Sequence, residues 1–176
     1  MKKSSQDKKK ETKETALLNE FVHAAFDDHP KAKAMLAAHP ELKNAHRMGE
    51  TLLHWLAVEG HSEAVDFLAG LGFDVNTASK FGNTPLIDAA DLGHEKTVAV
   101  LLARGADPNA NSLTTDTALA CALRSGHVRV VKMLLDAGAK LDYVTDIQET
   151  WRDHLPRIEE RRKEILALLA NYNAAL

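Results

Sequence analysis

Apolar residues recur along the chain at helical spacing, in three segments of similar length. The positions are Val65, Phe67 and Leu68; Val98, Leu101 and Leu102; and Val131, Leu134 and Leu135. Side chains three or four residues apart lie on one face of an α-helix. Each segment therefore predicts an amphipathic helix that buries one face, and the three helices are spaced by 33 residues.

The same 33-residue interval relates five columns of small, polar and apolar positions. They are Gly60, Gly93 and Gly126; Gly72, Gly105 and Gly138; Thr51, Thr84 and Thr117; Leu53, Leu86 and Leu119; and Asn76, Asn109 and Asp142. The first glycine of each copy is followed by a histidine: His61, His94 or His127. Agreement of independent columns on one period indicates a structural repeat, and a repeat decides the whole architecture.

The recurring residues mark where helices begin and end within each unit. A threonine hydroxyl at position 51, 84 or 117 can accept a bond from a free backbone N–H and so begin a first helix. Pro85 follows at a first-turn position, where its missing N–H costs nothing. Gly60 and its equivalents end that helix, because glycine readily adopts the left-handed backbone. One two-helix unit cannot bury its apolar face alone, so we expect the units to stack.

The second copy shows the pattern most fully, as Thr84-Pro85-Leu86, Gly93-His94 and Gly105-Ala106-Asp107-Pro108-Asn109. This resembles the ankyrin repeat, with its 33-residue period and T-P-L-H-x-A signature. The first copy has Thr51-Leu52-Leu53-His54, and Thr115 replaces the second-position glycine in the third. The resemblance implies an all-α solenoid of helix-turn-helix units joined by hairpin-like loops. It also implies a structural hydrogen-bonding role for His54.

We expect about five units including caps. The predicted boundaries are 16–47 for a degenerate N-terminal repeat, 48–80, 81–113 and 114–146 for the clear repeats, and 147–176 for a C-terminal capping unit. Within the first unit, the pattern predicts helices at Leu17–Asp27 and Pro30–Ala38. The polar run around Arg157–Glu164 suits a cap, since one face of a terminal unit meets water.

Residues 1–15 are predicted to be a disordered lysine-rich tail. Residues 1–14 carry six lysines against Asp7, Glu11 and Glu14, and no apolar residue beyond Met1. A segment that buries no apolar surface cannot offset the entropy of ordering its backbone. Electrostatic tethering by this tail to nucleic acid or to a membrane surface is an alternative role.

Composition favours a cytoplasmic protein. The formal net charge of −3 is too small to name a polyanionic partner. A single cysteine, Cys121, excludes an internal disulfide and fits a reducing compartment. The N-terminus lacks the apolar stretch of a secretory signal, and no run of about 18 apolar residues would span a membrane. We expect a monomer that does not insert into membranes.

No arrangement of residues predicts catalysis, a metal site or a cofactor. The three Gly-His histidines stand one repeat apart, about 10 Å, which is too far for nitrogens that share a metal ion. Their expected role is to bond neighbouring backbone and tie repeats together. Cys121 has no free histidine to act as its base. Asp88 and Asp91 could pair as carboxylates. Because no other reactive group converges on them, we interpret them as part of a solvated acidic face.

The resemblance implies that a partner binds along a concave groove lined by first helices and hairpin tips. The candidate residues at positions that vary between copies are Trp55, Lys80, Phe81, Asp88, Asp91, Leu92, Leu113 and Arg124. Apolar anchors within a charged rim are typical of interface hot spots. The structural alternatives are that Trp55 fills a gap between helices and that Phe81 packs on its own hairpin.

The sequence thus predicts a non-catalytic adaptor that binds a protein of unknown identity. A regulatory or chaperone-like accessory subunit of an enzyme or complex is an alternative, as is tethering through the lysine tail. We expect no small-molecule substrate and no nucleic-acid ligand for the repeat domain.

Overall fold

The computed structural model describes residues 5–47, 49–112, 117–140, 156 and 159–173. Its helices follow one another in pairs: α1 (Ser5–Asp27) and α2 (His29–Ala38), α3 (Leu52–Val58) and α4 (Ser62–Gly70), α5 (Pro85–Asp91) and α6 (Glu95–Ala103), and α7 (Ala118–Ser125) and α8 (Val128–Asp136). Helix α9 (Glu159–Asn173) ends the described chain. A 3-10 turn, η1 (Pro40–Asn44), and an antiparallel hairpin of β1 (His46–Arg47) and β2 (Glu50–Thr51) join the first two pairs.

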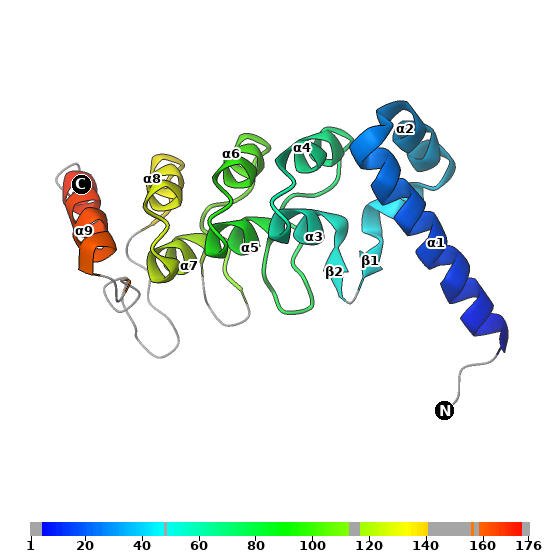
Figure 1. The fold of residues 1–176 in the computed structure, drawn as a ribbon, viewed down its shortest axis with the longest axis horizontal. Helices are drawn as coiled ribbons and strands as arrows, with labels where there is room; N and C mark the ends of the chain where they lie inside the picture. The colour runs from blue at the N-terminus through cyan, green and yellow to red at the C-terminus, as the bar shows by residue number, and fades with distance from the viewer. Residues whose placement is uncertain (1–4, 48, 113–116, 141–155, 157–158, 174–176) are drawn as a thin grey trace.

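The pairs stack side by side into an elongated array, as Figure 1 shows. First helices α3, α5 and α7 form one row, and second helices α4, α6 and α8 form the other. Each helix packs against the next in its own row and against its partner within the pair. The loops between pairs project beyond the row of first helices. The predicted all-α repeat solenoid is confirmed.

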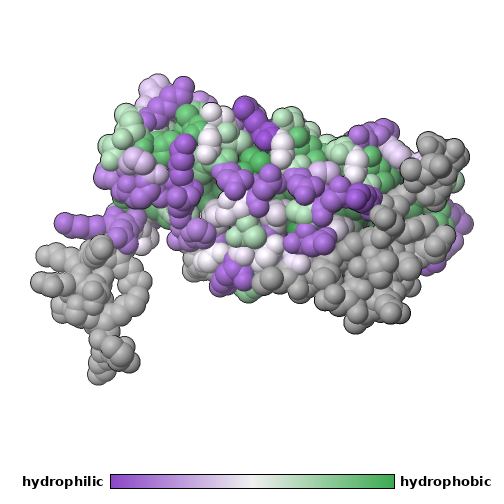
Figure 2. All heavy atoms as spheres, turned by 180° about the vertical axis from the view of Figure 1, so that it is seen from behind, coloured by the Kyte–Doolittle hydropathy of each residue, from purple (hydrophilic) through white to green (hydrophobic). Residues whose placement is uncertain are grey.

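The core is built from the columns that recur in the sequence. Equivalent leucines at positions 53, 86 and 119 of the first helices and 68, 101 and 134 of the second helices are all buried. Seen from behind, hydrophobic residues gather along the upper part of the array and hydrophilic residues form a band below them (Figure 2). Periodic apolar positions therefore make one continuous core instead of separate cores for each unit.

Threonine caps begin two of the first helices as the sequence predicts. The Thr84 hydroxyl accepts a bond from the Ile87 backbone N–H at 3.4 Å, and the Thr117 hydroxyl accepts one from Ala120 at 3.2 Å. Thr51 differs, because its hydroxyl makes no cap and instead lies 2.8 Å from His54 Nδ1. The Thr51 hydroxyl thus pairs with the His54 ring of α3 and not with a backbone N–H of that helix.

The second and third glycine-histidine steps each join their unit to the one before it. Gly60, Gly93 and Gly126 have φ angles of 74°, 73° and 75°, in the left-handed region. His94 Nε2 donates to the Val58 carbonyl at 2.8 Å, and His127 Nε2 donates to the Asp91 carbonyl at 3.0 Å. Each ring also lies over the preceding unit's glycine. These two histidines therefore bond neighbouring backbone as expected.

The N-terminal helix begins earlier than the sequence predicts. Helix α1 starts at Ser5, whereas the pattern predicts a disordered tail at residues 1–15 and a first helix from Leu17. Lysine, glutamate and glutamine all favour helix, so propensity extends α1 ahead of its first apolar positions. Helix α2 begins one residue before the predicted Pro30, and the Asp28 carboxylate caps it by accepting from Lys31 N–H at 3.0 Å.

The far end of the array is closed by α9, which packs against α8 and buries Ile165 and Leu169. The first part of the predicted C-terminal capping unit, residues 147–155, lies outside the described residues.

Replacing Gly93 by alanine should cost more stability than replacing Gly105, which is also left-handed. A Cβ at Gly93 would lie 2.5 Å from the His127 ring, whereas nothing lies within 4 Å of one at Gly105. Both variants incur about 1 kcal/mol of backbone strain. Gly93→Ala should lose about 1–2 kcal/mol more, because the ring must move away from the Asp91 carbonyl. Urea unfolding measures both, and equal losses would show that the ring contact contributes nothing.

Candidate functional site

The first helices and the loops that precede them present one face outside the core, which we call the first-helix face. Its described side chains are Trp55, Val58, Glu59, Lys80, Phe81, Asp88, Asp91, Leu92 and Arg124. All predicted site residues but one belong to it. The exception, Leu113, lies outside the described residues.

Phe81 stands at the tip of the loop before α5. A tight turn holds it there, with Ser79 N–H bonded to the Asn83 carbonyl at 2.8 Å and Gly82 N–H bonded to the Ser79 carbonyl at 2.9 Å. The Phe81 side chain is 56% exposed, and Lys80 Nζ lies 4.6 Å from its ring centroid. The ring is therefore available to a partner, with a cation already over one side.

Leu92 lies at the other end of α5 and is 49% exposed. The helix between it and Phe81 is seven residues long, or about 10 Å. The two apolar side chains are therefore separate points of contact on the first-helix face. Asp88 and Asp91 lie on the helix between them.

Trp55 is half-buried at the N-terminal end of the array. Its ring centroid lies 6.4 Å from Phe26 of α1 in an edge-to-face arrangement and 6.1 Å from His61. The indole therefore contacts α1 and the turn after α3. It stands at the edge of the first-helix face and away from Phe81.

Asp91 and Arg124 connect α5 to α7. The Asp91 carboxylate accepts from the Ser125 hydroxyl at 3.0 Å and lies 3.9 Å from Arg124 Nη2. The same guanidinium nitrogen lies 3.4 Å from Cys121 Sγ, and the thiol is buried. Because Asp91 and Arg124 are about half exposed, their ion pair contributes little to stability and can be rearranged by a ligand.

A chain of hydrogen bonds crosses from the first clear repeat to the second. His54 Nδ1 lies 2.8 Å from the Thr51 hydroxyl, and its Nε2 donates to the Asn83 carbonyl at 2.7 Å. The Asn83 amide then donates to Asp88 Oδ1 at 3.0 Å. Burial disfavours the charged form of both side chains. It therefore lowers the pKa of His54 and raises the pKa of Asp88 from 3.8 to about 6.

Asp88 and Asp91 do not act as a carboxylate pair in this arrangement. Asp88 is bonded to Asn83, whereas Asp91 is bonded to Ser125 and Arg124. Across the described part of the chain, no group of three His, Cys, Asp or Glu side chains is placed to hold a metal ion. The face offers separated apolar and charged contacts, which suit recognition of a surface.

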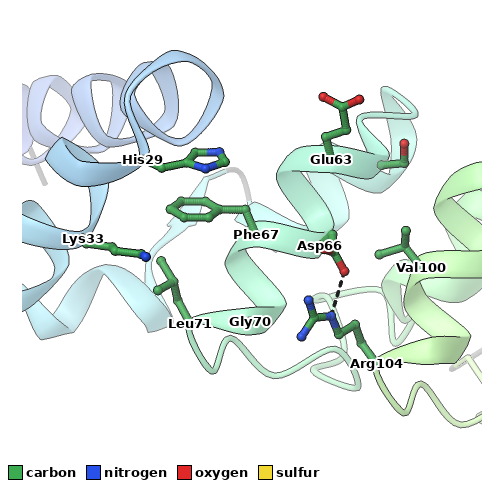
Figure 3. Close-up of a pocket in the computed structure, with 10 residues that line it drawn as sticks. His29, Lys33, Glu63, Asp66, Phe67, Gly70, Leu71, Val100 and Arg104 are labelled. Carbon is green, nitrogen blue, oxygen red and sulfur yellow. Dashed lines mark hydrogen bonds and ion pairs between the residues drawn. The ribbon is translucent and has the colours of Figure 1, made fainter.

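Sequence reasoning missed a hollow among α2, α4 and α6 on the second-helix side (Figure 3). There the His29 ring stacks on Phe67 at 3.7 Å, and Arg104 Nε donates to Asp66 at 2.8 Å. Gly70 opens the floor at a position where the next repeats carry Ala103 and Asp136. That missing side chain is the only signal in the sequence that could have pointed to it.

None of the described helices combines the length and apolar character needed to cross a membrane.

Two family models match the chain. The model described as Ankyrin repeats (3 copies) matches residues 21–112, and the model described as Ankyrin repeat matches residues 115–146. No curated protein matches the chain.

Replacing Asp88 by asparagine should stabilise the fold at neutral pH. The pKa of Asp88 is higher in the folded protein than in the unfolded chain, so the folded protein binds this proton more tightly. The protonated carboxyl therefore contributes its full stabilisation below about pH 4, and this stabilisation is lost as the pH rises through 6. The introduced amide would still accept the Asn83 bond without a buried charge. We expect a gain of about 1–3 kcal/mol at pH 7 and little gain at pH 4, measured by urea unfolding. An equal gain at both pH values would contradict the assignment.

Proposed function

The chain belongs to the ankyrin repeat family, and from that premise we propose that it is a non-catalytic adaptor that binds a protein partner through its first-helix face. Ankyrin repeats are generally protein–protein interaction modules. The proposal adds the surface and the anchoring residues for this chain. We take the adaptor to be a cytoplasmic monomer, in keeping with its single cysteine, the buried Cys121.

The observation that carries the proposal is the exposure of large apolar side chains on this face. Four large apolar side chains are exposed in the part of the chain that the structure describes. Phe81 and Leu92 lie on the first-helix face, Phe26 lies beside Trp55 at its edge, and Leu166 lies on α9. Burying such side chains against a partner supplies most of the binding free energy in typical interfaces.

Repeat geometry explains why these positions are free for recognition. The columns that hold the fold, such as the leucines and the glycine-histidine steps, carry similar residues in each copy. The face columns differ instead: Trp55, Asp88 and Cys121 are equivalent, as are Glu59, Leu92 and Ser125. Packing sets the first group, whereas in the second group the exposed Glu59 and Leu92 are able to match a partner.

Charged side chains on the first-helix face would orient a bound partner. Lys80 lies next to Phe81, and Asp88, Asp91 and Arg124 lie between the apolar points or beside them. Opposite charges on a partner would orient it and exclude partners with like charges. Lys80, Asp91 and Arg124 add little affinity of their own while they remain solvated, whereas Asp88 is largely buried and bonded to Asn83.

Photo-crosslinking tests where a partner binds. A photo-reactive phenylalanine analogue at position 81 should capture the partner, whereas the same analogue at position 166 on α9 should not. Mass spectrometry of the products identifies the captured protein. Equal capture from both positions, or capture from 166 alone, would contradict binding through the first-helix face.

Substitution of the anchors should then weaken the identified complex. Phe81→Ala and Leu92→Ala should each raise Kd about 5- to 30-fold, or about 1–2 kcal/mol, because each removes exposed apolar surface that the partner buries. Leu166→Ala is the matched control and should leave Kd unchanged. Isothermal titration measures the values, and circular dichroism confirms that the variants fold. Unchanged affinity in folded Phe81→Ala and Leu92→Ala variants would contradict the proposal.

A further inference from the structure

The first junction of the array departs from the pattern that ties the other repeats. At the next two junctions a histidine ring lies over a glycine of the preceding unit and donates to its backbone. In the N-terminal unit the position equivalent to Gly60 is Asp27, and the residue after it is Asp28. His61 therefore has no glycine to cover.

His61 packs instead against an aromatic side chain. Its ring meets Phe26 edge-to-face at 4.8 Å between centroids. In the part of the chain that the structure describes, no hydrogen bond joins this ring to the preceding unit, and His61 is exposed. The hydrogen bond from ring to backbone that the other two histidines provide is replaced here by an aromatic contact.

A hollow opens at this junction, with a volume of about 500 Å³. Phe26, Trp55 and His61 form one side of it, and their centroids are 4.8–6.4 Å apart. Val22, His23 and Asn19 of α1 and the Asp27 carboxylate complete the lining. The hollow is therefore an aromatic surface beside an acid.

The charges around the hollow favour a cation. No lysine or arginine lines it among the residues that the structure describes. Asp27 makes no ion pair with any described residue, and Lys31 on α2 pairs with Glu20 at 2.8 Å. An aromatic face attracts an ammonium or guanidinium group through its ring electrons, and the carboxylate adds direct attraction.

We propose that this hollow binds the side chain of a lysine or arginine from a protein partner. The alkyl stem lies along Trp55 and Phe26, and the charged head lies toward Asp27. The inference rests on the proposed function in one respect, that the occupant belongs to a protein. It extends that function by naming a residue class that the partner must present at the N-terminal end of the first-helix face.

A peptide titration of the full chain tests the inference without the partner. The probes are acetyl-Gly-Lys-Gly-amide and the matched norleucine peptide, which keeps the stem but lacks the charge. The Trp55 indole N–H signal is followed by NMR in a Trp151→Phe background. We expect saturable shifts with the lysine peptide, at millimolar affinity, and binding of norleucine at least about fivefold weaker.

Two substitutions locate the effect. Asp27→Asn should weaken lysine-peptide binding about threefold while leaving norleucine unchanged, because only the charged head faces the carboxylate. Phe26→Leu keeps apolar volume but removes the ring face, and should weaken lysine by a similar factor. Leu166→Ala, at an exposed apolar side chain of α9 outside the hollow, is the control and should change neither value.

The outcomes are distinct. Equal binding of norleucine and lysine would overturn the inference in favour of a purely apolar pocket, and absence of saturable shifts at Trp55 would overturn it outright. Neither result bears on the adaptor function, which is tested by crosslinking and by Phe81→Ala and Leu92→Ala. Conversely, lysine binding that survives both Asp27→Asn and Phe26→Leu would place the peptide elsewhere and also overturn the inference.

Discussion

The structure depends on one repeated contact, in which a histidine ring covers a glycine of the preceding unit and donates to a carbonyl two residues before it. His94 does this to Gly60 and Val58, and His127 does it to Gly93 and Asp91. Only a residue without a side chain leaves room for the ring, and glycine also adopts the left-handed bend at this position readily. The contact therefore fixes the spacing between adjacent units, because it needs the histidine of one unit and the glycine of the unit before it.

Fixed spacing turns separate helices into one surface. Because each first helix is held by the same contact, side chains such as Asp88 and Cys121 occupy equivalent places on successive units, and their identities can differ without disturbing the stack. The ends show what happens where the contact is absent. At Gly126 the side chain of Arg161 from α9 lies where a histidine would lie. At the first junction Phe26 meets His61 instead, and a hollow remains. At the N-terminal end, loss of the tie thus leaves the hollow that we propose as a binding site.

Much of the fold could be predicted from the sequence because its determinants repeat. Thr84, Pro85, Gly93 and Leu101 act locally or on the adjacent unit, so their 33-residue recurrence reveals both helix ends and core faces. The early start of α1 was missed because residues 5–15 carry no apolar periodicity that the pattern could register. The propensity of lysine and glutamate continues the helix there.

The candidate site was less predictable because its contacts do not repeat. The variable columns indicated Phe81 and Leu92, but not their separation by α5. The raised pKa of Asp88 comes from its burial, and the Asp91–Ser125–Arg124 cluster joins helices through residue types that do not recur at the equivalent positions of other copies. The stack of His29 on Phe67 and the contact of Trp55 with Phe26 likewise join residues unique to the N-terminal half. Sequence periodicity carries no information on such pairs.

The glycine-histidine contact holds adjacent units together at the second and third clear repeats and is missing at the first. NMR observation of the histidine Nε2 protons tests it most directly. We expect slowly exchanging protons for His94 and His127, with through-space contacts to Val58 and Asp91, and fast exchange for His61. Fast exchange at all three rings, or equal protection of His61, would contradict it.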